Sequence, residues 1–247
     1  MNKYKPAIIL GMLLLIFWEA LARFINAMYI LPSPSAIVLK IWQLKEPLFM
    51  VHLPATLLVT IMGIFIAVLL GVLLAILMSI NDKIQNALYP LVIATQTIPI
   101  TALAPLFVLW FGYGIWSKVV VTVLITFFPI TISFYDGLRS TKREMEELLL
   151  TYGATKKQLF FKLKIPSALP SFFTALKMSI PLSLIGAAIG EWLGAQSGLG
   201  YFSKRMMTQL DGAGVFAPIV ILSLLAIVLV FVVNIIENKV INWRNEI

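Results

Sequence analysis

The sequence contains no cysteine and a single histidine, His52. Disulfides, thiol chemistry, iron–sulfur clusters and metal sites built from several histidines are therefore excluded by composition. Charged residues are also scarce: they make up 12% of the 247 residues, against about 25% in a soluble domain. Because 60% of the residues are apolar, most of the chain is suited to membrane lipid rather than to water.

The net charge of +8 does not indicate nucleic-acid binding. Lysine and arginine stand in short segments between long apolar runs, which is where charges that flank membrane spans are found. A nucleic-acid-binding chain would instead gather them into a basic patch. We expect lipid, and no nucleic acid, around this protein.

Apolar runs long enough to cross a bilayer recur along the chain. They predict an all-α integral membrane protein that forms one transmembrane domain over residues 1–247, with six spans. The expected spans are residues 6–22, 53–80, 87–110, 119–135, 172–189 and 213–236. In the first span, Glu19 and Arg23 have the i, i+4 spacing of a helical ion pair. This run is too long for a signal peptide and lacks a small-residue cleavage site.

The distribution of lysine and arginine predicts the orientation. If the N-terminus is cytoplasmic, six of the nineteen fall outside, which leaves thirteen inside. The six are Arg23, Lys40, Lys45, Lys118, Lys204 and Arg205. The positive-inside rule then favours cytoplasmic N- and C-termini and a cytoplasmic loop at residues 139–166.

The second span carries small residues every fourth position: Gly63, Ala67, Gly71 and Ala75. This spacing produces a nearly flat helix face that a neighbouring helix can approach closely. The span is therefore expected to belong to a helix bundle.

Polar groups interrupt the third and fifth spans. Pro90, Pro99 and Pro105 bracket Thr95, Gln96 and Thr97 and predict a kinked helix with polar side chains at membrane depth. These side chains either join helices or, with Ser183 and Glu191, line a translocation path. Glu191 has a second interpretation as an ion-pair partner of Lys204 or Arg205. His52 is interpreted as a membrane-interface residue rather than a ligand.

The basic loop has strong local signals for two short helices. The first, near residues 142–152, can end at Gly153, since glycine readily takes the left-handed conformation that follows a helix. The second can begin at Thr155, with Gln158 completing a capping box. Pro166 and Pro170 then lead into the fifth span, because proline is tolerated at helix starts.

The spacing in this loop resembles the EAA loop of ABC importer permeases of the type I fold. Glu147, Gly153, Leu163 and Ile165-Pro166 fall on its Glu, Gly, Ile and Leu-Pro positions, while two leucines replace the alanines after the glutamate. The resemblance implies a coupling helix that docks on an ATPase subunit, with Glu147 as polar anchor, Gly153 as bend and Ala154 as small contact. The implied ATPase-coupling set is Glu146, Glu147, Gly153, Ala154, Thr155, Leu163, Ile165 and Pro166. A lipid-binding interfacial helix is the alternative.

The resemblance extends beyond the loop. The segments 31–35, 105–114, 190–194 and 198–201 are similar to the nitrate, sulfonate and taurine branch of these permeases. Segments 96–99 and 190–195 most resemble members associated with pyrimidine precursors of thiamine or with riboflavin-like compounds. The family implies a bacterial cell (inner) membrane, a homodimer of this chain, two ATPase subunits and an extracellular or periplasmic binding protein. Sulfonate, taurine or nitrate import is the alternative within the family.

The sequence has no phosphate-binding loop of the Gly-x4-Gly-Lys-Ser/Thr type. ATP and Mg²⁺ are therefore expected on the partner ATPase, and this chain needs no cofactor of its own. A hydrolytic triad is also missing, so an enzyme is not expected. The rival class is a stand-alone ion-coupled transporter or channel, which usually needs ionisable residues deep within its spans. A non-transporting scaffold that recruits a soluble partner through the loop is a third possibility.

Overall fold

The computed structural model describes residues 5–241, which contain helices and no strand. This confirms the predicted all-α fold class. The helices are α1 (Lys5–Ile25), α2 (Pro34–Gln43), α3 (Leu53–Ile80), α4 (Asp82–Thr97), α5 (Ile100–Phe111), α6 (Ile115–Arg139), α7 (Arg143–Thr151), α8 (Lys156–Leu159), α9 (Ile165–Gly194), α10 (Leu199–Thr208) and α11 (Gly212–Val240), with two π-helical segments, η1 (Pro47–His52) and η2 (Phe160–Lys164).

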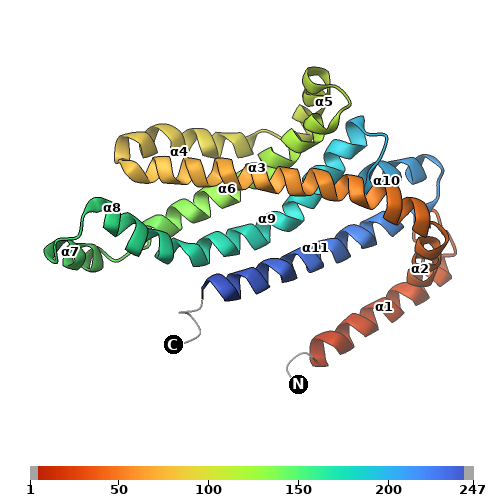
Figure 1. Cartoon of the computed structure of the whole chain (residues 1–247). Coiled ribbons are helices and arrows are strands. Elements are labelled where there is room, and N and C mark those ends of the chain that lie inside the picture. Colours follow the sequence, from red (N-terminus) through yellow and green to blue (C-terminus); the bar gives the residue numbers. More distant parts are fainter. Residues whose placement is uncertain (1–4, 242–247) are drawn as a thin grey trace.

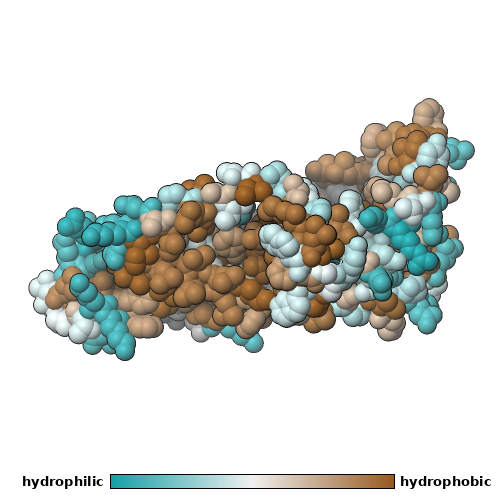
Figure 2. Space-filling view, turned by 90° about the horizontal axis from the view of Figure 1, so that it is seen from above, coloured by the Kyte–Doolittle hydropathy of each residue, from teal (hydrophilic) through white to brown (hydrophobic). Residues whose placement is uncertain are grey.

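The long helices run along the length of an elongated molecule (Figure 1). Helices α7 and α8 lie at one end, here called the loop end, and α2 and α10 lie at the other, here called the α10 end. Five of the described helices are long and apolar enough to cross a membrane, and α4 with α5 could form a sixth span. Figure 2 shows apolar side chains over the middle of the molecule and hydrophilic side chains toward both ends.

Helix α6 is the centre of the bundle and packs against α3 on one side. The small residues of α3 face this contact. Ala67 and Ala75 are fully buried, and a Cβ atom on Gly71 would lie 3.0 Å from Ile130 of α6. A Cβ atom on Gly63 would collide with the Thr122 side chain. The predicted flat face on the second span is thus confirmed.

Helix α6 also packs against α9, again through glycines. A Cβ atom on Gly186 would lie 2.9 Å from the Cα atom of Thr122, and one on Gly190 equally close to that of Lys118. Ser179 and Ser183 are fully buried. Because these side chains are small, the backbones of α6 and α9 approach closely.

The third span is broken rather than kinked. Helices α4 and α5 meet at 95°, and Ile98, the first of the two residues between them, is extended (φ −90°, ψ 122°). A residue that precedes proline is driven out of the helical region, so Pro99 explains the break. Pro90 and Pro105 stand inside α4 and α5. The prediction placed the interruption correctly but underestimated it.

The loop runs into the fifth span without a break in the helix. Helix α8, the π-helical turn η2 and α9 follow one another without a non-helical residue, from Lys156 to Gly194. Pro166 falls among the first two residues of α9, where a missing N–H is tolerated. The π-helical turn η1 likewise continues directly into α3, with Pro54 among the first two residues of α3.

Helix α1 packs against α2, and its Trp18 ring lies 6.0 Å from the Phe216 ring of α11. The Glu19 carboxylate accepts hydrogen bonds from the Ser35 amide (3.0 Å), the Ser35 hydroxyl (2.7 Å) and Arg23 Nε (2.7 Å). This confirms the predicted Glu19–Arg23 pair. Ser33 of segment 31–35 caps α2. Most side chains of α1 are exposed in this chain.

Candidate functional site

Helix α7 presents an exposed face at the loop end. None of its residues is buried, and Met145, Leu148 and Leu150 are each about half exposed (48%, 49% and 49%). The Glu147 carboxylate stands among them, bonded only to Arg143 Nε at 2.9 Å. Apolar side chains exposed beside a charged group are typical of a protein-docking surface.

Gly153 makes the bend after α7. Its φ is +81°, and its amide donates to the Leu150 carbonyl at 2.9 Å while the Ala154 amide donates to Leu149 at 3.0 Å. No atom lies within 4 Å of a Cβ atom built on Gly153. Glycine is therefore needed for its backbone conformation rather than for lack of space.

The second loop helix has the predicted capping box. The Gln158 amide donates to Thr155 Oγ1 at 3.2 Å, and the Thr155 amide donates to Gln158 Oε1 at 2.8 Å. These reciprocal bonds satisfy two amides that a helix start leaves unpaired. Leu163, Ile165 and Pro166 follow in the continuous helix and are half-buried. They therefore form its packed base.

Glu146 and Glu147 have different environments although they are adjacent. Glu146 accepts a hydrogen bond from Thr141 Oγ1 at 2.7 Å and pairs with Lys164 Nζ at 3.0 Å. Partial burial raises the pKa of Glu146, but the bonds from Thr141 and Lys164 outweigh it and hold the pKa below its ordinary value. Glu146 closes the loop on itself and leaves Glu147 facing outward.

We expect Glu146→Ala to loosen the loop. A half-buried ion pair of this kind stabilises by about 1 kcal/mol, so local opening should rise about fivefold. Limited trypsin digestion at Lys156 and Lys157 should accelerate by that factor. Glu144→Ala is the control, because the Glu144 carboxylate lies on the same helix but makes no hydrogen bond or ion pair within residues 5–241. Equal digestion of the two variants would contradict the role of Glu146.

The polar residues of the broken span differ in what they offer. Thr95 and Thr97 donate to carbonyls of their own helix, Val92 at 2.6 Å and Ala94 at 2.8 Å. The exposed Gln96 amide makes no hydrogen bond within the described part of the chain. Ser183 is buried and donates to the Ile180 carbonyl at 2.6 Å. Gln96 is therefore the side chain of this set that is available to a ligand.

Glu191 belongs to α9, and its buried side chain lies beside the start of α10 and caps the first amides of that helix. Glu191 Oε2 accepts from the Gly200 amide at 2.7 Å. Thr56 Oγ1 accepts from the Leu199 amide at 2.8 Å, and His52 Nδ1 accepts from the Gly198 amide at 3.1 Å. Three side chains, from η1, α3 and α9, thus bind the first amides of one helix, and together they form what is here named the α10 cap.

The α10 cap corrects two predictions. Glu191 forms no ion pair with Lys204 or Arg205, because its carboxylate points to the α10 amides while Lys204 Nζ donates to the Trp192 carbonyl at 2.6 Å. His52 is 6% exposed, which is too buried for a membrane-interface residue. No hydrogen bond within residues 5–241 joins Glu191 or Ser183 to the 95–97 segment.

Comparison with known proteins identifies the family. A family model described as "binding-protein-dependent transport system inner membrane component" matches residues 67–242. The chain belongs to this family. It is 57% identical to the formylaminopyrimidine transport permease protein ThiX of Halalkalibacterium halodurans, over 95% of this chain and 94% of the relative. It is 38% identical to the riboflavin transport system permease protein RibX of Chloroflexus aurantiacus, over 94% and 88%.

A solved permease has the same fold. The MetNI methionine ABC transporter, in inward-facing conformations, has a chain that superposes with a TM-score of 0.62 at 18% identity, covering 85% of this permease and 97% of that chain. The family confirms an ABC transport permease rather than an enzyme. It is a membrane component of an importer, as the loop spacing predicted.

Sequence analysis missed Thr56 and His52 as partners of the permease's α10. The available signal was negative: α10 begins after Gly198, which has no side chain to cap the helix. A buried helix start without its own cap requires acceptors from elsewhere. The sequence does not say which residues supply them.

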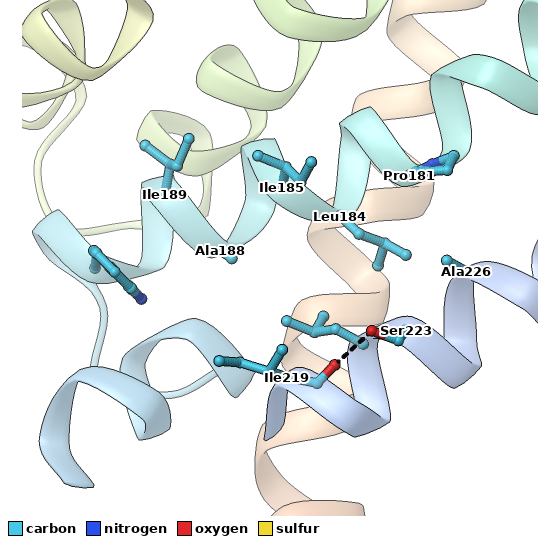
Figure 3. Close-up of a pocket in the computed structure, with 10 residues that line it drawn as sticks. Pro181, Leu184, Ile185, Ala188, Ile189, Ile219, Ser223 and Ala226 are labelled. Carbon is cyan, nitrogen blue, oxygen red and sulfur yellow. Dashed lines mark hydrogen bonds between the residues drawn. The ribbon is translucent and has the colours of Figure 1, made fainter. Parts of the chain in front are cut away.

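A predominantly apolar groove lies between α9 and α11 of the permease. It has a volume of about 390 Å³ and is lined by residues such as Leu184, Ile185, Ala188 and Ile219. Figure 3 shows the hydroxyl of Ser223 bonded back to the Ile219 carbonyl, at 3.0 Å. With its one hydroxyl occupied, this groove suits a lipid chain or another helix better than a polar solute.

Proposed function

We propose that this permease forms the membrane path of an ATP-driven importer and that its loop receives the movement of a separate ATPase subunit. The observation that carries the proposal is the exposure of α7, on which the Glu147 carboxylate faces outward. Gly153 sets its angle, and Ala154 lies in a hollow of about 310 Å³ with Tyr152 and Lys162. The loop is anchored on α9 by Thr155, Leu163, Ile165 and Pro166.

Energy would enter through this loop, since the sequence has no phosphate-binding loop. ATP and Mg²⁺ would bind the partner ATPase. ATP binding would draw two coupling loops together and rock the bundles, and hydrolysis would reset them. A partner can shift this equilibrium only through contacts that differ between its two states.

The loop end would face the cytoplasm of a bacterial cell, with both termini inside. Thirteen of nineteen basic residues then lie on the cytoplasmic side. The α10 end would face outward, toward an extracellular or periplasmic binding protein. The assembly would contain two copies of this chain and two ATPase subunits, so that the exposed Gln96 and Thr97 face a path between copies rather than lipid.

A formylaminopyrimidine-like heterocycle is the substrate that we propose. The name of the 57%-identical relative supports this choice. The side chains of the broken span support it independently. The Gln96 amide is uncharged, and it can both donate to the ring nitrogens and accept from the amino groups of a neutral heterocycle. A sulfonate would instead require a cation at this depth.

Uptake by the purified complex tests the proposal. The permease with its co-purified ATPase and binding protein would be placed in vesicles loaded with ATP. We expect uptake of labelled formylaminopyrimidine but not of taurine, and none when ADP replaces ATP. Taurine uptake would overturn the substrate. Uptake by the permease alone, without ATP, would overturn the importer and support a secondary transporter or channel.

A further inference from the structure

The α10 end contains a hollow that combines aromatic and cationic side chains. It has a volume of about 320 Å³ and lies between the α5–α6 turn, the end of α9 and one face of α10. Tyr113, Trp192 and Tyr201 line it together with Lys204, Arg205 and Thr208. No carboxylate contributes to its lining. We refer to these six residues as the α10 surface.

The cations of the α10 surface lack acidic partners, whereas two other cations at this end have them. Lys40 pairs with Asp211 at 2.6 Å, and Arg23 pairs with Glu19 at 2.7 Å. Arg205 is exposed and forms no ion pair within residues 5–241, and Lys204 Nζ binds only the Trp192 carbonyl. The surface thus carries two positive charges that no carboxylate of the described chain compensates.

The α10 surface is rigid because its helix is fixed on the opposite side. Leu199, Phe202 and Met206 are buried against η1 and α11. The α10 cap binds the first amides of the helix. Docking on a surface that is already ordered loses little conformational entropy, so its contacts are converted efficiently into affinity.

We propose that the α10 surface is the docking site for an acidic face of the binding protein. Tyrosine, tryptophan and arginine are the residues enriched at the energetic centres of protein interfaces. The unpaired cations would attract carboxylates and steer the encounter. The inference rests on the proposed function, because it requires the α10 end to face outward. A second copy of this chain is the competing occupant.

Site-specific photo-crosslinking tests which molecule covers the surface. A photoreactive amino acid would replace Thr208 in the full complex, and the matched control would replace Trp42, which is 68% exposed on α2 at the same end. We expect Thr208 to cross-link to the binding protein and Trp42 to give at most a tenth of that yield. Cross-linking of Thr208 to a second copy of this chain, or equal yields at both positions, would overturn the proposal.

Charge reversal provides a second measurement. Arg205→Glu should slow association of the binding protein about tenfold at low salt and flatten its salt dependence. Lys45→Glu makes the same change in net charge at the same end, where Lys45 lies 4.3 Å from the Trp42 ring, and should alter the rate less than about twofold. Equal effects would overturn the proposal. If the two variants have equal effects but the ATPase still co-purifies, the docking site is wrong and the proposed importer function stands. If the unmodified complex contains no ATPase, both the docking site and the importer function are overturned.

Discussion

Gly198→Ala is expected to lower the stability of the permease by several kcal/mol, more than any other substitution discussed here. Gly198 has φ +119° and ψ 157°, a region that is open almost only to glycine and costs other residues about 1–3 kcal/mol. The added methyl group would also collide with the Glu191 carboxylate. Displacing Glu191 leaves the buried Gly200 amide unpaired, which costs about 1–3 kcal/mol more.

Denaturation of the purified permease, followed by tryptophan fluorescence, measures this loss. Gly153→Ala is the matched control, because Gly153 also has positive φ (+81°) but open space around it. It should therefore incur only the backbone strain, about 1 kcal/mol. In a Glu191→Ala background the collision is removed, so Gly198→Ala should cost less there than in the unmodified chain. Additive effects would show that the two groups do not interact.

Glu147→Lys is expected to have the largest effect on transport. The Glu147 side chain is 63% exposed, and the Arg143 side chain that pairs with it is 89% exposed. The substitution should therefore change folding stability by less than about 1 kcal/mol. If α7 docks on the ATPase, reversing the charge of Glu147 should reduce ATP-driven uptake at least about tenfold, since an unpaired charge at an interface costs several kcal/mol.

Uptake and ATPase co-purification should be measured together with thermal stability. Asp82→Lys makes the same charge change at an exposed position of the loop end and is expected to leave transport unchanged. Undiminished uptake by Glu147→Lys would contradict the coupling role of α7. If Glu147→Lys lowers thermal stability in parallel with uptake, the loss of uptake would reflect misfolding instead.

Local rules predicted the spans and the loop, because their signals lie within a few residues of the structures that they specify. Uncharged runs place α3 and α11 to within a few residues of their ends. Gly153 and the Thr155–Gln158 box determine the loop turn through their own backbone atoms. The spacing around Glu147 identified the family that comparison then confirmed.

The features that sequence analysis missed depend on distant contacts. The α10 cap joins His52 to Gly198, 146 residues further along the chain, and no local pattern encodes that pairing. The 95° angle after Thr97 depends on how α5 packs against α6, although Pro99 marks the position of the break. The prolines before the fifth span favoured a new helix start, whereas a π-helical turn carries the helix through.

The unbroken helix from Lys156 to Gly194 fixes the rotational phase between the loop and the bundle. Each residue in an α-helix turns the chain by about 100° and advances it by about 1.5 Å. Inserting or deleting one residue between the Thr155 cap and Pro166 would therefore rotate the loop by about 100° relative to the glycine face that α9 presses onto α6. Side chains along this stretch can vary, but its length cannot change without turning α7 to face another direction.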